Sequence, residues 1–208
     1  MTRAAVMRSG IVAALLMLVL AAGCGRHSPL GPPTPTGATI LGGPDVTSAS
    51  PPPPGWTSRP VVPTSQQQAQ DTILGYFKKT LRALPPGTAL DATRYSGATN
   101  TPPCKDVTTG VAPVSLSTIG ELNLPAGVDP VGVVAQLGDT WKSWGWYVIE
   151  RDGFRKPNRF GYAPDGYILH IMAKDPVTDP PTLIADSPCF AGDLPKDRSP
   201  FPVVLQAD

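Results

Sequence analysis

Three cysteines and two histidines are the side chains of this 208-residue chain best suited to covalent or metal chemistry. The cysteines are Cys24, Cys104 and Cys189, and the histidines are His27 and His170. A protein metal site needs several thiolates or imidazoles, usually at short spacing along the chain. Neither Cys104 nor Cys189 has another cysteine or a histidine nearby, so the sequence predicts no metal site.

The sequence also lacks the common catalytic motifs. It contains no phosphate-binding GxxxxGK(S/T) loop, no HExxH, GxSxG or CxxC motif and no dinucleotide-binding glycine pattern. His170 lies within an alternating apolar run, where a strand would place it on the same face as Ile168 and Met172. A partly buried structural histidine is the favoured interpretation, and an envelope hydrolase using His170 with a carboxylate is the alternative. We therefore predict no enzyme and no cofactor.

Cys24 follows a segment with the features of an export signal. Residues 8–24 read RSGIVAALLMLVLAAGC, and Arg3 and Arg8 supply positive charge before the apolar stretch. That stretch, of about 14 small and apolar residues, is shorter than the roughly 20 that a membrane-spanning helix needs. The small residues directly before Cys24 resemble the lipobox of bacterial lipoproteins, although Ala21 stands where a larger apolar residue is usual.

The resemblance to a lipobox implies a signal peptide over residues 1–23 and a diacylglycerol on the Cys24 thiol. An ordinary secretory signal that is cut near Ala22 is the alternative. With lipidation, we expect the protein to be exported and anchored to the outer face of the cell membrane through the acyl chains on Cys24.

Lipidation of Cys24 leaves Cys104 and Cys189 as a pair. Exported proteins fold in an oxidising compartment, so we predict a disulfide between these two cysteines. In the chain-entropy model, closing a loop of about 86 residues stabilises the fold by about 4–5 kcal/mol. The bridge would therefore contribute much of the stability of a small domain.

Composition indicates one compact domain together with unstructured chain. Only 16% of the residues are charged, while 27 are proline and 21 are glycine. Removal of the signal takes away two arginines and leaves a net charge of −1. With a charge this close to zero, the sequence does not indicate a basic surface that would bind nucleic acid. It also does not indicate a cluster of basic residues that would assist a lipid anchor at the membrane.

Residues 24–64 are predicted to form a disordered tether. Eleven of the 40 residues from 25 to 64 are proline, and large apolar side chains are almost lacking. Such a segment cannot bury enough surface to offset the entropy of ordering it. Trp56 is its lone aromatic residue, and we expect it to pack on the edge of the folded domain rather than to serve in recognition.

Residues 65–208 are predicted to form a single α+β domain. A helix over 65–84 begins with the capping box of Ser65 and Gln68, and a second helix begins at Asp129-Pro130 and ends at Gly145. Strands are expected over 91–96, 111–122, 146–151, 159–162, 167–174 and 182–186, with a Pro-Asp-Gly hairpin turn at 164–166. The order predicts two layers: an antiparallel sheet of about four to five strands with two helices on one face.

The lipobox, the Pro/Thr-rich tether, the Gln-rich first helix, the WKSWGWYV stretch and the two late Pro-Cys pairs together resemble mycobacterial cell-envelope lipoproteins of the LppA-like group. The resemblance implies a location in the cell envelope. It assigns no catalytic residues.

The segment 151–159 is the candidate binding loop. It carries Arg151, Arg155, Lys156 and Arg159 among aromatic residues, a combination suited to an anionic envelope component or to a protein partner. A solvated loop with no binding role is the alternative. We predict a non-enzymatic binding module, with a lipid or small-molecule carrier that has an apolar cavity between sheet and helices as the alternative.

Overall fold

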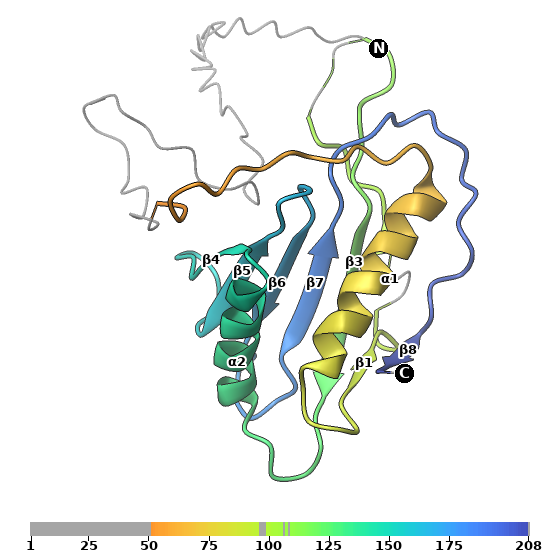
Figure 1. The fold of residues 1–208 in the computed structure, drawn as a ribbon. Helices are drawn as coiled ribbons and strands as arrows, with labels where there is room; N and C mark the ends of the chain where they lie inside the picture. The colour runs from red at the N-terminus through yellow and green to blue at the C-terminus, as the bar shows by residue number, and fades with distance from the viewer. Residues whose placement is uncertain (1–50, 96–98, 106, 108, 208) are drawn as a thin grey trace, which may run out of the picture.

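The computed structural model describes residues 51–95, 99–105, 107 and 109–207. Its two helices and its sheet form one α+β domain (Figure 1). The predicted signal peptide and Cys24 lie outside the described residues.

The described residues form two α-helices, α1 (Gln66–Arg82) and α2 (Pro130–Ser143). Both start as their sequences predict. The Ser65 side chain accepts a hydrogen bond from the Gln68 amide at 3.0 Å, and the Asp129 carboxylate accepts bonds from two amides of the first turn of α2. The second helix ends one residue earlier than expected, because Trp144 is the C-cap and Gly145, at φ 80°, follows it.

The described residues form eight strands in one antiparallel sheet, so the expectation of four to five strands is too low. Their order across the sheet is β4-β5-β6-β7-β3-β1-β8, and β2 also pairs with β3. The bounds are β1 Ala89–Asp91, β2 Thr99–Asn100, β3 Ser117–Asn123, β4 Tyr147–Ile149, β5 Asn158–Tyr162, β6 Ile168–Met172, β7 Thr182–Asp186 and β8 Val204–Gln206.

The strand expected over 111–122 begins later than predicted, at Ser117, and corresponds to β3. Val114 instead forms isolated bridges with Pro103 on one side and Phe190 on the other. Because Val114 lies between these two chain segments, their neighbours Cys104 and Cys189 come together. They form the predicted disulfide, with a Cα–Cα distance of 6.2 Å.

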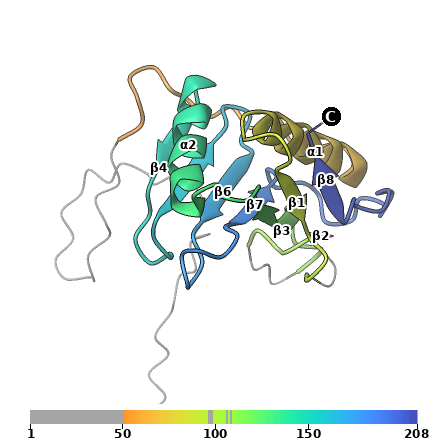
Figure 2. The same ribbon diagram turned by 90° about the horizontal axis from the view of Figure 1, so that it is seen from below.

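Both helices cover the same face of the sheet (Figure 2), as expected. Their apolar sides and the facing strand residues make the main core, in which Trp141 of α2 is fully buried. Gly161 of β5 permits this close packing, since a Cβ there would lie 2.7 Å from the Trp141 ring. Fully buried Phe77, Leu137 and Leu169 also fill the layer between the helices and the sheet, and the hollows described below lie at the surface.

The opposite face of the sheet carries a second, smaller aromatic cluster. Since side chains alternate along a strand, Phe160 and Tyr162 point away from the helices, whereas Gly161 between them faces Trp141. They pack with Tyr147 and Ile149 of β4, and Trp56 and Phe154 lie against this cluster.

Residues 53–61, which we call the strap, run along the end of the sheet at which α2 ends (Figure 1, orange). The Arg59 amide donates to the Pro164 carbonyl at 2.7 Å, and the Val61 amide donates to the Asp165 carbonyl at 2.8 Å. Trp56 packs on the domain, as predicted, with its ring 5.3 Å from that of Tyr147. Two backbone hydrogen bonds and an aromatic contact therefore hold the strap, which lies within the segment predicted to be a tether, against the domain.

Candidate ligand-binding groove

The four cations of the predicted binding loop lie together near the β4–β5 edge, but each has a partner. The Arg151 guanidinium stacks on Phe154 and Phe160, 5.6 and 5.2 Å from their ring centroids. It also donates to the Tyr162 hydroxyl at 3.2 Å. Arg151 thus caps the aromatic cluster and is half-buried.

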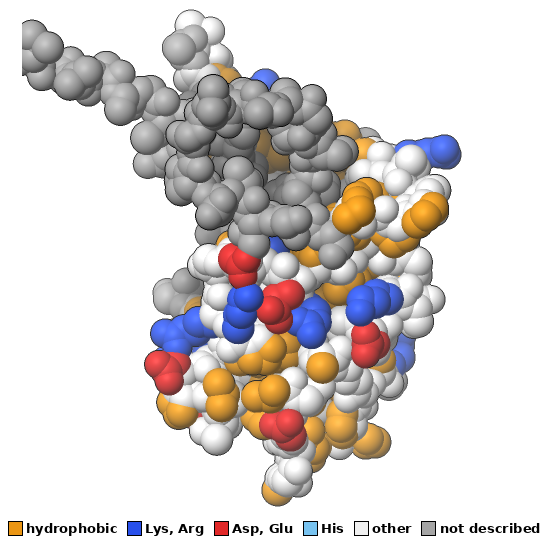
Figure 3. Space-filling model, turned by 90° about the vertical axis from the view of Figure 1, so that its left-hand side faces the viewer, with side chains coloured by type: hydrophobic (Ala, Val, Ile, Leu, Met, Phe, Trp, Pro, Cys, Tyr) orange, Lys and Arg blue, Asp and Glu red, His pale blue; other side chains and the backbone are white. Residues whose placement is uncertain are grey.

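The other three cations of the loop form ion pairs. Arg155 lies 3.5 Å from Asp175, and Arg159 lies 2.7 Å from Glu150. Lys156 contacts both Glu150 and Asp152, at 3.3 and 2.6 Å. Figure 3 views this side of the molecule and shows basic and acidic side chains interleaved. Local acids therefore balance the positive charge that the sequence suggested for binding.

Burial and the two ion pairs act on the pKa of Glu150 in opposite directions. Burial raises the pKa, while hydrogen bonds from Arg159 and Lys156 lower it further than burial raises it. The net result is a lowered pKa, so this carboxylate stays charged and holds the two cations in the loop.

His170 is a buried residue on the helix-free face of β6. Its ring lies 4.6 Å from that of Phe160, and burial followed by the charge of Arg151 lowers its pKa to about 4. Its Nδ1 has no hydrogen-bond partner among the described residues. In the same part of the chain, no hydrogen bond or ion pair joins His170 to a carboxylate. The acid that the hydrolase alternative requires is therefore not placed beside it.

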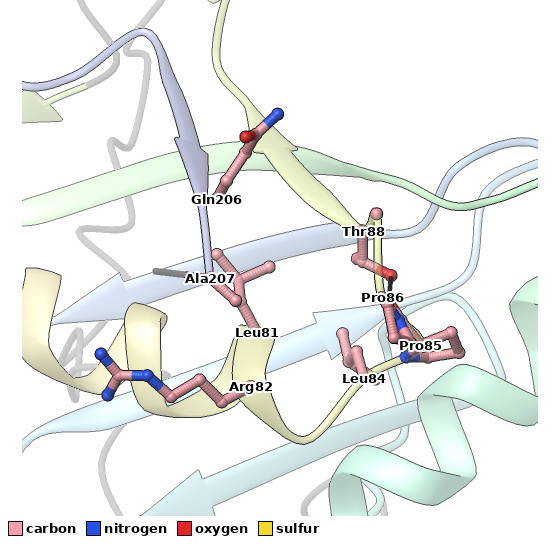
Figure 4. A pocket seen from close by; sticks show the side chains of 9 residues that line it. Leu81, Arg82, Leu84, Pro85, Pro86, Thr88, Gln206 and Ala207 are labelled. Atoms are coloured by element: carbon pink, nitrogen blue, oxygen red, sulfur yellow. Dashed lines mark hydrogen bonds between the residues drawn. The ribbon is translucent and has the colours of Figure 1, made fainter.

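Two hollows of the surface have linings that are about as polar as they are apolar. One, of ≈ 390 Å³, lies beside Glu121, which receives Arg94 and Lys174 as ion partners. The other, of ≈ 320 Å³, lies between the end of α1 and β8. In Figure 4 the Thr88 hydroxyl bonds the Pro85 carbonyl, at 2.7 Å, in the wall of this second hollow.

The largest of these hollows is a groove of ≈ 690 Å³ between the strap and the domain. Two tryptophans and three prolines give it predominantly apolar walls. Its two charged lining residues are Arg59 and Lys142, and none of its described lining residues is acidic. The full lining is Pro53, Pro54, Gly55, Trp56, Thr57, Arg59, Lys142, Gly145, Trp146 and Pro164.

Packing fixes the wall of the groove that faces the strap. The Trp146 ring contacts Tyr76 edge-on at 4.9 Å and stacks on Trp141 at 6.0 Å. The Tyr76 hydroxyl donates to the Asp165 carboxylate at 2.5 Å and so ties α1 to the hairpin turn that accepts the strap. Burial, followed by this hydrogen bond, raises the Tyr76 pKa, so its hydroxyl remains a donor.

The strap wall is held by fewer contacts. It depends on the Trp56–Tyr147 ring contact and on the two backbone hydrogen bonds from Arg59 and Val61. The indole Nε1 of Trp56 is buried and has no hydrogen-bond partner among the described residues. A buried donor without an acceptor is unfavourable, so the Trp56 contact holds the strap less strongly than a hydrogen-bonded indole would.

Lys142 also forms an exposed ion pair with Asp139 at 3.0 Å on the solvent side of α2. Both side chains are more than half exposed, and such pairs contribute about 0–1 kcal/mol. Lys142 can therefore exchange this partner for an anionic group in the groove at little cost.

Sequence reasoning missed the groove, because its walls come from segments that are about 90 residues apart. One signal pointed to it: Trp56, the single aromatic residue in a proline-rich segment. The turn at 164–166 and the end of α2 were both predicted, but their meeting with the strap was not.

Comparisons with protein-family models, curated proteins and solved structures found no match to this chain. Within residues 51–95, 99–105, 107 and 109–207, no helix is long and apolar enough to cross a membrane. The same residues contain no group of three or more His, Cys, Asp or Glu side chains placed to hold a metal ion.

Proposed function

We propose that this chain is a lipid-anchored envelope protein, attached through Cys24, and that its domain is a non-enzymatic binding module. Its ligand site is the groove between the strap and the end of α2, and the ligand is predominantly apolar. The observation that carries the proposal is the pair of tryptophans, Trp56 and Trp146, that line one groove from two separate segments.

The groove is a better candidate than the loop 151–159. Ligand sites are concave and mostly apolar, with a few polar groups that fix orientation. The groove has this character, whereas Arg155, Lys156 and Arg159 all pair with acids, and Arg155 lines a smaller and more polar hollow.

The proposed location draws its support from the sequence. The lipobox-like segment before Cys24, the proline-rich segment after it and the likeness to mycobacterial LppA-like lipoproteins are its basis. The Cys104–Cys189 bridge agrees with folding in an oxidising compartment.

Replacement of Cys24 tests the anchor. We expect Cys24→Ser to abolish labelling of the protein by a radioactive fatty acid and to move the processed protein out of the membrane fraction, since each buried CH₂ contributes about 0.8 kcal/mol to anchoring. Undiminished membrane association of the processed variant would contradict the lipid anchor.

Filling the groove tests the binding site. The probe is N-phenyl-1-naphthylamine, a neutral apolar dye, titrated into the mature chain carrying Cys24→Ser. We expect saturable binding that Thr57→Trp weakens by about tenfold or more, because the new ring occupies the groove. Gln206→Trp, which adds the same ring to the hollow of Figure 4, is the matched control and should leave binding unchanged. Equal loss in both variants, or no saturable binding, would contradict the proposal.

A further inference from the structure

We propose that the ligand of the groove is an anionic lipid of the membrane that holds the anchor. Its acyl chain would lie against the tryptophan and proline walls, and its anionic headgroup would meet Arg59 and Lys142. This inference rests on the proposed function and adds the chemical class and the source of the ligand.

Charge is the first argument. The described lining of the groove contains two cations and no acid, and the one ion partner of Lys142, Asp139, lies outside the lining in an exposed pair that an anion can replace. A neutral ligand would leave both cations without a partner inside the groove. Because an anionic headgroup would pair with both, the groove is complementary to an anion.

The shape and polarity of the walls are the second argument. An inorganic anion or a free headgroup would use the cations and leave the apolar surface of Trp146, Pro53 and Pro164 in contact with water. An apolar chain would cover that surface. An amphiphile satisfies both the cations and the apolar walls.

The position of the strap is the third argument. Trp56 follows Cys24 by 32 positions in the sequence, and a chain of that length spans at most about 110 Å. The groove is therefore close along the chain to the proposed anchor. Tethering raises the effective concentration of membrane lipids, so a modest intrinsic affinity suffices for occupancy.

Short-chain lipids as monomers provide the test. Dioctanoyl phosphatidylglycerol, dioctanoyl phosphatidylcholine and glycerol 1-phosphate are titrated by calorimetry into the mature chain with Cys24→Ser. We expect one-to-one binding of the phosphatidylglycerol, about tenfold tighter than that of the phosphatidylcholine and of glycerol 1-phosphate. Thr57→Trp should abolish the binding.

Charge variants locate the headgroup. The double variant Arg59→Ala with Lys142→Ala should weaken the binding of phosphatidylglycerol by about tenfold and leave the binding of phosphatidylcholine unchanged. Arg82→Ala with Lys196→Ala removes the same net charge outside the groove and should change neither. Equal losses in the two double variants would overturn the proposal, since the effect would then be long-range attraction.

The remaining outcomes separate the two proposals. Equal binding of both lipids, blocked by Thr57→Trp, would contradict the proposal that the ligand is anionic. It would agree with the proposal that the groove binds an apolar ligand. Binding of glycerol 1-phosphate as tight as that of the phosphatidylglycerol would contradict the proposal that the ligand is a lipid, because the acyl chains would then add nothing to the affinity. If neither lipid nor the neutral dye binds, the proposed function of the groove falls together with this inference.

Discussion

The ring of Trp56 lies 5.3 Å from the ring of Tyr147, with the two planes inclined by 53°. This contact joins a segment that precedes α1 to the edge strand β4. Because β4 directly follows the end of α2, the contact sets the strap opposite Trp146 and leaves the groove between them. The site therefore depends on a piece of chain whose composition is that of a linker.

Loss of the Trp56 ring should release the strap. We expect Trp56→Ala to speed hydrogen exchange at the Arg59 and Val61 amides by about tenfold or more, because local opening becomes easier, while core amides such as that of Leu169 stay protected. Val62→Ala, an exposed position on the same segment, is the control. Unchanged exchange in Trp56→Ala, measured by mass spectrometry or NMR, would show that the backbone bonds alone hold the strap.

Removal of the disulfide should cost a large part of the stability. Cys104→Ser with Cys189→Ser is expected to lower the free energy of unfolding by about 4 kcal/mol, since the bridge closes a long loop in the unfolded chain. Urea unfolding of the oxidised, reduced and double-variant proteins measures this, and the last two should agree. Two freely alkylatable thiols in the exported protein before reduction would refute the bridge.

Burial of His170 should make stability depend on pH. Its folded pKa of about 4 lies below the unfolded value of about 6.5, so the folded state favours the neutral ring. The stability it contributes is complete above pH 6.5 and falls by up to about 3 kcal/mol as the pH falls to 4. Asp186 opposes this trend, because burial raises its pKa despite a hydrogen bond with Ser117.

A variant isolates the contribution of His170 from that of the carboxylates. His170→Leu should flatten the difference in unfolding free energy between pH 6.5 and pH 4, and the NMR signal that it removes should titrate near pH 4 in the parent protein. An identical pH dependence in parent and variant would contradict the assigned burial.

Two glycines offer a matched test of the packing between α2 and β5. At Gly161 a Cβ would lie 2.7 Å from the Trp141 ring, so Gly161→Ala should destabilise the domain by about 1–3 kcal/mol. At Gly75, inside α1, a Cβ meets nothing within 4 Å, and Gly75→Ala should stabilise by about 0.5–1 kcal/mol. Thermal unfolding of the two variants gives the comparison. A gain in stability from Gly161→Ala would contradict the close packing.

The sequence predicted those helices and turns that are determined by residues close together in the chain. Ser65 and Asp129 cap the helices as their types suggest, and the turn at 164–166 joins β5 to β6. The strand expected over 91–96 lies instead at β1, Ala89–Asp91, and the three-residue strand β8 was not predicted. These two strands pair with each other across the whole domain, so their positions depend on contacts that the chain order does not reveal.

In the candidate site, too, features that depend on neighbouring residues were predicted and features that depend on distant segments were not. The density of cations in residues 151–159 and the adjoining acids Glu150 and Asp152 are visible in the sequence, but the pairing of Arg155 with Asp175, beyond β6, is not. Trp56 was predicted to pack on the domain, and it does. That this packing creates a groove depends on the Arg59 and Val61 hydrogen bonds to a turn about 100 residues away.

The most direct test of the account is photo-crosslinking of the lipidated protein in phosphatidylglycerol vesicles that contain a phosphatidylglycerol with a diazirine on its acyl chain. Mass spectrometry then maps the modified residues. The account predicts adducts on residues 53–59 and 142–146, suppressed by Thr57→Trp and retained when Arg155, Lys156 and Arg159 are all replaced by Ala. Adducts concentrated on residues 151–159, or unaffected by Thr57→Trp, would contradict it.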